Sequence, residues 1–284
     1  MNFKQSSIQA IITNALKEDV GPEDYSTLAS IPDSKNVNAL VLIKQNGIVA
    51  GIDLAEEILH VVDSSLGIEK LVEDGQKVNQ GTTAMKIVGR VHSILKAERL
   101  LLNFMQRLSG IATATYQMTN KIAHTKCKIL DTRKTTPNLR ILEKWAVLQG
   151  GGVNHRFGLY DMVMLKDNHI DCAGGITSAV ENAYRYLKEN QLKLKIEVET
   201  RSIDEVKEVL ATQKIDRIMF DNFSPEKIRE ALKLVPNHIQ TEASGGITED
   251  SIVSYAETGV QFISVGALTH SYTSLDISLL IAIA

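Results

Sequence analysis

The amino-acid sequence predicts an α/β protein, in which an N-terminal α+β domain is followed by parallel strands arranged as an α/β barrel. Helical and strand-like patterns are mixed over roughly the first hundred residues, whereas strands and helices alternate strictly from Lys126 onward. Each strand of this second region also ends on polar or charged residues or on glycine. With 284 residues, 44% hydrophobic and 23% charged, the chain is long enough for one large domain or two of ordinary size.

The N-terminal region is expected to combine helices with an antiparallel or mixed sheet. Apolar residues recur at helical spacing through Met1–Val20, which predicts an amphipathic helix. The further elements expected are strands at Ala39–Lys44 and Gly47–Ile52, a helix at Leu54–Asp63, short strands between Gly67 and Val91, and one or two helices over Ser93–Lys121.

The second region is expected to form parallel strands joined by helical crossovers. Strands are predicted at Lys128–Arg133, Asp161–Lys166, Leu194–Thr200, Arg217–Asp221, Ile239–Ser244 and Phe262–Gly266. Helices are predicted between them at Asn138–Leu148, Ser202–Thr212, Pro225–Leu234 and Glu249–Thr258. Six strands, rather than the eight of a complete barrel, leave an open barrel and a closed one as alternatives.

The residues that end these strands indicate where a site lies. They are Arg133 and Lys134, Lys166 and Asp167, Glu199, Asp221 and Asn222, Ser244, and Gly266. The solvation of a loop explains one polar strand end, but it is a poor explanation for six in succession. Because barrel active sites are built at the C-terminal ends of the strands, we expect these side chains to surround one site.

The charge distribution favours a small anionic ligand over a nucleic acid. The net charge is −3, whereas a nucleic-acid-binding face usually has an excess of clustered basic residues. Between Asp131 and Ile170, however, there are six Lys or Arg residues against four Asp or Glu residues. Local basic charge in an acidic chain indicates an anionic ligand.

Membrane insertion and export are not predicted. The N-terminal helix lacks the basic start and continuous apolar run of a signal peptide, and no segment approaches the ~18 apolar residues that span a bilayer. The two cysteines cannot build a disulfide framework and match no metal motif. We therefore expect a cytoplasmic protein.

A cationic cluster is predicted around the first two of these strands. Its members are Arg133 and Lys134 after the first strand, His155 and Arg156 after the glycines at 150–152, and Lys166 at the end of the second strand. Arginine offers a planar fork to carboxylates and phosphates, and lysine a compact positive charge. The glycines are expected to let the backbone approach a ligand. For each of these residues considered alone, the alternative to ligand binding is a position in a solvent-exposed loop.

Carboxylates on the next strands are candidates for holding Mg²⁺. Glu197 and Glu199 share one face of a strand, and Asp221 ends the following one. Carboxylates on adjacent strands can hold Mg²⁺ together with substrate oxygens. Salt bridges to neighbouring lysines are the alternative, and they apply most to Glu197.

A phosphate site is predicted at the last two strands. Ser244-Gly245-Gly246 forms a turn between a strand and a helix, and Gly266 to His270 follows the final strand. Backbone N–H groups at such paired glycine loops, beside a helix N-terminus, form the usual phosphate site of barrels.

Taken together, these motifs closely resemble the quinolinate phosphoribosyltransferase family, also called carboxylating nicotinate-nucleotide pyrophosphorylases. The motifs are Asp131-Thr-Arg-Lys-Thr-Thr-Pro, Gly150-Gly-Gly-Val-Asn-His-Arg, Leu165-Lys-Asp-Asn-His, Glu197-Val-Glu, Phe220-Asp-Asn, Glu242-Ala-Ser-Gly-Gly-Ile and Ser264-Val-Gly-Ala-Leu-Thr-His, with Glu98-Arg-Leu-Leu-Leu-Asn and Leu108-Ser-Gly-Ile-Ala-Thr upstream. The resemblance covers essentially the whole chain.

The resemblance implies a reaction of NAD biosynthesis, in which quinolinate and phosphoribosyl pyrophosphate give nicotinate mononucleotide, pyrophosphate and CO₂ with Mg²⁺. It also implies an N-terminal α/β sandwich over residues 1–112 and an incomplete α/β barrel over residues 113–284. The last dozen residues would pack back on the N-terminal domain. The family forms homodimers with sites shared between subunits.

The resemblance also implies residue roles. Arg133, His155, Arg156 and Lys166, with Thr132, would hold the two quinolinate carboxylates, and Arg99 would reach the substrate from the other subunit. Lys134 would lie near the pyrophosphate and the reacting centre. Glu199 and Asp221 would face the ribose and the metal, while Ser244, Gly245, Gly246, Gly266 and His270 would bind the 5′-phosphate. We expect Lys134, Lys166, Glu199 and Asp221 to be catalytic.

Two other functions compete with this hypothesis. A paralogous pyrophosphorylase of molybdenum-transport operons shares the fold and several motifs, although the complete cationic cluster argues against it. A non-catalytic nucleotide-binding barrel would bind phosphate without turnover.

Overall fold

The fold comprises two compact units, described here from a computed structural model of residues 1–33 and 35–282. One unit contains residues 1–116, 136–151 and 271 to the C-terminus, and the other contains residues 117–135 and 152–270. The predicted α/β class, with an N-terminal sheet domain and an open parallel barrel, is confirmed. The single domain boundary at residues 112 and 113 stays a prediction, because compactness groups segments that are distant in sequence.

The first unit is built on a four-stranded antiparallel sheet of order β12-β1-β5-β3, beside the small pair β2-β4. Its strands are β1 (Asn36–Ile43), β2 (Gly47–Ile48), β3 (Gly67–Lys70), β4 (Lys77–Val78), β5 (Thr83–Arg90) and β12 (Ile277–Ala282). Its helices are α1 (Ser6–Val20), α2 (Tyr25–Ser30), α3 (Ile52–Val62), the first part of α4 (Val91–Lys121) and α5 (Arg140–Gln149). The strand expected at Gly47–Ile52 is wrong beyond Ile48, because α3 begins at Ile52.

Helix α4 is continuous over 31 residues. The sequence allowed one or two helices over Ser93–Lys121, and the expectation of two helices is wrong. Ser109 accepts a hydrogen bond from the backbone N–H of Ala50 at 2.9 Å. A Cβ on Gly110 would lie 2.3 Å from the carbonyl oxygen of Thr273. The Leu108–Thr113 motif therefore serves close packing within the first unit rather than ligand chemistry.

Helix α5 belongs to the first unit, although the alternation of strands and helices predicts it as a barrel crossover. Its fully buried Glu143 accepts hydrogen bonds from Arg107 Nε at 2.9 Å and from the Thr136 N–H at 3.1 Å. Trp145 meets Phe3 edge-to-face, with ring centroids 5.2 Å apart. These long-range contacts, which local periodicity does not report, decide where the helix packs.

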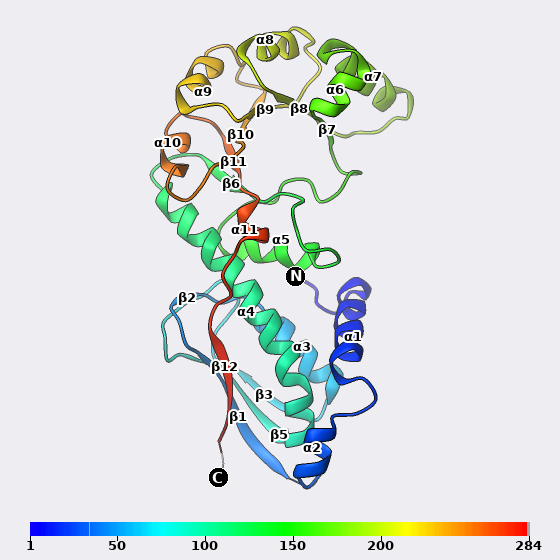
Figure 1. The fold of residues 1–284 in the computed structure, drawn as a ribbon, viewed down its shortest axis with the longest axis vertical. Helices are drawn as coiled ribbons and strands as arrows, with labels where there is room; N and C mark the ends of the chain where they lie inside the picture. Colours follow the sequence, from blue (N-terminus) through cyan, green and yellow to red (C-terminus); the bar gives the residue numbers. More distant parts are fainter. Residues whose placement is uncertain (34, 283–284) are drawn as a thin grey trace. The chain divides into compact units, whose positions relative to one another are not determined.

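The second unit is an open sheet of six parallel strands in the order β6-β11-β10-β9-β8-β7. The strands are β6 (Lys128–Leu130), β7 (Val163–Leu165), β8 (Ile196–Thr200), β9 (Arg217–Asp221), β10 (Gln240–Ser244) and β11 (Phe262–Ser264). The helices are α6 (Asp167–Ala173), α7 (Ile176–Glu189), α8 (Ile203–Ala211), α9 (Pro225–Leu232), α10 (Ile252–Ala256) and α11 (Ala267–His270). Figure 1 shows the strands along an arc, with α8, α9 and α10 on its outer side.

Strand β8 is buried on both faces, which is the mark of a parallel strand between two packed layers. Ile196, Val198 and Thr200 alternate with Glu197 and Glu199 along it, so the two carboxylates point to the same face. No helix in the part of the chain that the structure describes is long and apolar enough to cross a membrane.

Candidate functional site

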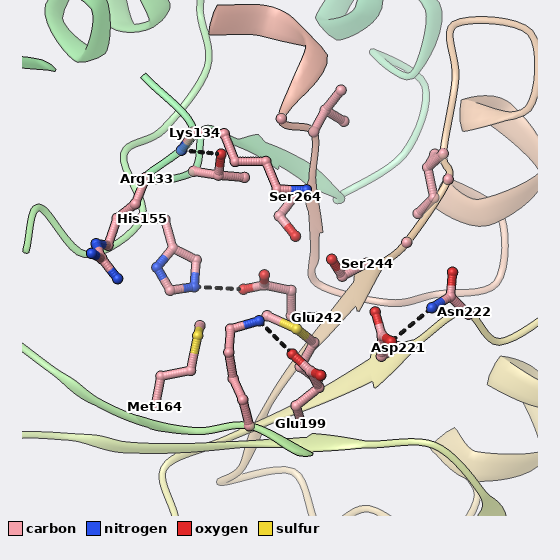
Figure 2. Close-up of a pocket in the computed structure, with 18 of the residues that line it drawn as sticks. Arg133, Lys134, His155, Met164, Glu199, Asp221, Asn222, Glu242, Ser244 and Ser264 are labelled. Atoms are coloured by element: carbon pink, nitrogen blue, oxygen red, sulfur yellow. Dashed lines mark hydrogen bonds and ion pairs between the residues drawn. The ribbon is translucent and has the colours of Figure 1, made fainter. Parts of the chain in front are cut away.

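A cavity of about 870 Å³ lies at the C-terminal ends of the six parallel strands, within the second unit. Most site residues predicted from the sequence line this cavity. The exceptions are Arg99, which lies on α4 in the first unit, Glu197 and the glycines at 150–152. The predicted lining residues are Thr132, Arg133, Lys134, His155, Arg156, Lys166, Glu199, Asp221, Ser244, Gly245, Gly246, Gly266 and His270. Figure 2 labels six of them around the cavity, namely Arg133, Lys134, His155, Glu199, Asp221 and Ser244.

The loop after β6 places Lys134 beside the loop after β11. The Lys134 N–H donates to Thr132 Oγ1 at 3.0 Å, and the Lys134 carbonyl accepts from Thr269 Oγ1 at 2.9 Å. A Cβ on Gly266 would lie 3.0 Å from Lys134 Cδ. Gly266 therefore leaves room for the lysine side chain to enter the cavity.

Arg133 and Arg156 make one wall of the cavity positive. Burial of Arg156, followed by repulsion from Arg133, lowers the pKa of the Arg156 guanidinium. Arg156 Nη1 donates to the Met162 carbonyl at 3.1 Å, which fixes one edge of its fork. Two guanidiniums that repel each other in a partly buried wall favour an anion placed between them.

Lys166 and Glu199 form an ion pair across the ends of β7 and β8. The Lys166 Nζ lies 2.6 Å from Glu199 Oε2, and the lysine side chain is 45% exposed (Figure 2). Solvent screens such a pair, so its contribution to stability is small. Asp221, at the end of β9, accepts from Asn222 Nδ2 at 2.7 Å.

The loop after β10 has left-handed backbone at two successive glycines. Gly245 has φ +97° and Gly246 has φ +62°, and a Cβ on Gly245 would lie 2.3 Å from Asn222 Oδ1. The Asn222 N–H donates to the Ser244 carbonyl at 2.8 Å, which joins the ends of β9 and β10. The helix expected beside these glycines begins only at Ile252, so loop residues 244–248, and not the start of that helix, line the cavity here.

The family resemblance implies that this loop binds the 5′-phosphate, so replacing Gly245 with alanine is expected to weaken phosphoribosyl pyrophosphate binding at least tenfold. A left-handed φ costs a non-glycine residue about 1–2 kcal/mol, and the new Cβ would also displace Asn222. Gly259→Ala is the matched control, because it imposes φ +92° in a turn outside the cavity. Calorimetric titration should show the loss only in Gly245→Ala, and equal losses in both variants would contradict this account of the loop.

His155 and Glu242, which line the cavity, belong to a buried charged cluster with Glu197 and Arg217. His155 Nε2 is 3.1 Å from Glu197 Oε2 and 3.3 Å from Glu242 Oε2, and both carboxylates are 0% exposed. Arg217 Nη1 lies 3.1 Å from Glu242 Oε2. The first three side chains are close enough to hold a metal ion, but the guanidinium already supplies a cation to the two carboxylates.

The cluster binds a proton near neutral pH. Burial alone lowers the pKa of His155, but hydrogen bonds and attraction to Glu197 and Glu242 more than offset this and raise it to about 9. Burial, then repulsion from Glu242, raises the pKa of Glu197 to about 7. The backbone nitrogen of Arg156 lies 2.6 Å from His155 Nδ1. The raised pKa of His155 therefore favours its imidazolium form near neutral pH, close to both carboxylates.

Two residues of the site were missed by the sequence analysis. Glu242 lines the cavity and Arg217 supports it from below, although neither was assigned a role. A charged residue in the middle of a strand expected to be buried is the signal that could have found Glu242. The glycines at 150–152 do not line the cavity, and a Cβ on Gly150 would lie 2.3 Å from the Ala112 carbonyl oxygen. Their expected approach to a ligand is therefore wrong, since Gly150 serves packing against α4.

Two family models match the chain. The model described as "Quinolinate phosphoribosyl transferase, C-terminal domain" matches residues 111–280, and its N-terminal counterpart matches residues 24–109. The C-terminal match includes every residue that lines the cavity.

Relatives match over almost the full length. A chloroplastic nicotinate-nucleotide pyrophosphorylase [carboxylating] of Arabidopsis thaliana is 47% identical over 96% of this chain and 82% of its own. A probable enzyme of the same name from Bacillus subtilis is 41% identical, over 98% and 94%. The solved structure of the nicotinate-nucleotide pyrophosphorylase from Francisella tularensis superposes with a TM-score of 0.92 at 39% identity, over 97% and 96%. Because one relative is chloroplastic, the cytoplasmic location stays a prediction.

Proposed function

Because the chain belongs to the quinolinate phosphoribosyl transferase family, we propose that it transfers the phosphoribosyl group of phosphoribosyl pyrophosphate to quinolinate. Pyrophosphate and CO₂ leave, and nicotinate mononucleotide is formed for NAD biosynthesis. The observation that carries the proposal is a single cavity with a wall of cations on one side and carboxylates beside glycine loops on the other.

The cationic wall suits a pyridine dicarboxylate. Arg133 and Arg156 each offer a fork to one carboxylate, Lys166 a point charge, and Thr132 a hydroxyl. The loops after β10 and β11 suit the 5′-phosphate, with Ser244, Gly245, Gly246, Gly266 and His270. Lys134 lies between these two regions, against Gly266, and would face the pyrophosphate.

The first chemical step breaks the bond between ribose C1 and pyrophosphate, and the quinolinate nitrogen takes the place of the leaving group. Positive charge develops on the ribose ring, where Glu199 and Asp221 would stabilise it. Lys134 would attract the negative charge that grows on the pyrophosphate. No nucleophilic side chain is needed, because the pyridine nitrogen is the nucleophile.

The second step removes the carboxylate next to the new pyridinium nitrogen as CO₂. The electron pair left on that carbon lies beside N⁺, and a proton then replaces it. Arg133, Arg156 and Lys166 would hold the dicarboxylate in place, while the buried walls exclude water. These residues therefore act by position and charge.

Glu199 and Asp221 fit a magnesium ion. Both are oxygen ligands that line the cavity from adjacent strands, and Mg²⁺ is usually bound by one or two carboxylates together with substrate phosphates. The bound ion would neutralise charge on the departing pyrophosphate. Lys166 lies 2.6 Å from Glu199, so its ammonium would have to share that carboxylate with the ion.

We also propose a homodimer in which Arg99 completes the partner's site. The support is that Arg99, placed in the substrate site by the family resemblance, does not line the cavity of its own second unit. Mixing inactive Arg99→Ala and Lys166→Ala subunits should then restore up to about a quarter of the activity, because a quarter of randomly formed sites draw both intact residues. Subunit exchange must be verified by native mass spectrometry, and exchange without recovery would contradict shared sites.

The proposed function is tested by turnover. With quinolinate, phosphoribosyl pyrophosphate and Mg²⁺, the purified protein should release pyrophosphate and CO₂. Nicotinate, which lacks the second carboxylate, should be a far poorer substrate. Binding of phosphoribosyl pyrophosphate without turnover would favour the non-catalytic barrel instead.

A further inference from the structure

Lys134 lies in a loop without regular secondary structure, between the end of β6 at Leu130 and the start of α5 at Arg140. Backbone groups in such a loop lack strand or helix partners, so side chains or water must satisfy them. The Lys134 N–H donates to Thr132 Oγ1 at 3.0 Å, and the Lys134 carbonyl accepts from Thr269 Oγ1 at 2.9 Å. Two threonine hydroxyls therefore hold the backbone of this cavity lysine.

The parallel pairing of β6 and β11 brings Thr269 to this loop. Leu130 lies opposite Ser264 in the register of the two strands, and the Val265 N–H donates to the Leu130 carbonyl at 2.9 Å. Parallel neighbours leave the sheet at the same edge, so the segments that carry Lys134 and Thr269 begin side by side. Figure 2 shows the Lys134 side chain extending toward Ser264, at the end of β11.

The Thr269 side chain is placed to support the cavity and not to contact a ligand. Thr269 is 1% exposed and does not line the cavity, whereas Gly266 and His270 on the same loop do. Its Oγ1 also lies 3.3 Å from the Gly266 carbonyl, within its own turn. A hydroxyl has one hydrogen to donate, and the 2.9 Å contact with the Lys134 carbonyl is the shorter of the two.

The position of the Lys134 ammonium depends on where its backbone is held. A lysine ammonium sits on a flexible four-carbon stem, which by itself fixes no position. The stem of Lys134 packs against the loop after β11, since a Cβ on Gly266 would lie 3.0 Å from Lys134 Cδ. The Thr269 hydroxyl joins that same loop to the Lys134 backbone. Backbone and stem are therefore held by one segment, which limits the positions that the ammonium can take.

We propose that Thr269 is a positioning residue for the transfer step, and that its buried hydroxyl holds the Lys134 backbone so that the ammonium meets the departing pyrophosphate. This inference rests on the proposed function for the identity of the leaving group. It adds to the site a residue that lies outside the cavity lining.

Replacing Thr269 with valine tests the proposal, because valine has nearly the same shape but no hydroxyl. We expect kcat to fall about 10- to 100-fold, since a misplacement of about 1 Å in a catalytic group can cost about 100-fold in rate. The dissociation constant of quinolinate should stay within about twofold of wild type, and Thr269→Ser, which keeps the hydroxyl, should restore most of kcat. Should the valine variant fold poorly, Thr269→Ala removes the same hydroxyl without adding a methyl group. An unchanged kcat in the folded variant would overturn the proposal.

A double-mutant cycle shows whether Thr269 acts through Lys134. In a Lys134→Gln background, Thr269→Val should change kcat by less than about twofold, because the lysine that it positions is absent. An equal fall in kcat in both backgrounds would mean that the variant disturbs the cavity as a whole and would overturn the proposal. Thr212→Val is the control, because Thr212 donates to the Val209 carbonyl at 2.7 Å within its own turn, outside the cavity, and should leave kcat unchanged.

Hydrogen exchange separates this inference from the proposed function, because it needs no substrate. Peptides that contain residues 132–136 should exchange at least about fivefold faster in Thr269→Val than in wild type, and at the wild-type rate in Thr269→Ser. Unchanged exchange in Thr269→Val would overturn the inference even if the enzyme turns over. Absence of turnover by the wild-type protein would overturn the proposed function, while the exchange rates would still decide whether Thr269 holds the loop.

Discussion

Replacing Arg133 with alanine is expected to raise the dissociation constant of quinolinate by at least about 30-fold, because losing one partner of a desolvated charge pair costs about 2–5 kcal/mol. Arg133 lies close enough to Arg156 to lower its pKa, so the two guanidiniums act on the same anion. Phosphoribosyl pyrophosphate binding should change less, since its proposed contacts are Lys134, Glu199, Asp221 and the loops after β10 and β11, and Arg133 is not among them.

Calorimetric titration of each substrate measures this split. Arg185→Ala removes the same side chain from an exposed position on α7 outside the cavity and should leave both affinities unchanged. Equal losses of both substrates in Arg133→Ala would mean that Arg133 serves the cavity as a whole, and its assignment to the dicarboxylate would be wrong.

Replacing Glu199 with glutamine is expected to lower kcat by about 100- to 1,000-fold, the loss seen when one preorganised electrostatic group is removed from a transition state. Quinolinate binding should be preserved or tightened. The reason is the 2.6 Å contact with Lys166, because an ammonium released from its carboxylate is free to attract the ligand.

Steady-state kinetics with quinolinate titration test the second prediction. Glu205→Gln is the matched control, because it breaks a surface pair with Arg201 that is worth about 0–1 kcal/mol and should leave kcat unchanged. A kcat within threefold of wild type in Glu199→Gln would remove Glu199 from the catalytic group. Loss of quinolinate binding would instead place it in the dicarboxylate site.

Local sequence patterns could predict the strands of the barrel and the residues at their ends. The pattern of period two places Glu197 and Glu199 on one face, and the strand exits bring Lys166, Asp221 and Ser244 to one edge. The C-terminal ends of parallel strands always lie at the same edge of a sheet, whichever strands are neighbours. For that reason the lining of the cavity was largely foreseeable without knowledge of how the strands pair.

Contacts between distant segments could not be predicted in the same way. Glu242 and Arg217 meet because β9 and β10 are neighbours in register, and sequence periodicity does not give register. Helix α5 follows a barrel strand but packs with Arg107 and Phe3 in the first unit. Gly150 and its neighbours have the composition of a ligand loop, yet Gly150 allows a close approach to α4. A glycine in a sequence can indicate that there is no space for a side chain at its position, but it does not identify the neighbouring atoms.

Labelled CO₂ release tests the central claim most directly. Quinolinate carrying isotope in the carboxyl group next to the ring nitrogen should yield one labelled CO₂ for each pyrophosphate in a single turnover, and the nucleotide product should contain one carboxyl group. Release of pyrophosphate without labelled CO₂, or a nucleotide that retains both carboxyl groups, would contradict the claim that this cavity binds the dicarboxylate and catalyses its decarboxylation after phosphoribosyl transfer.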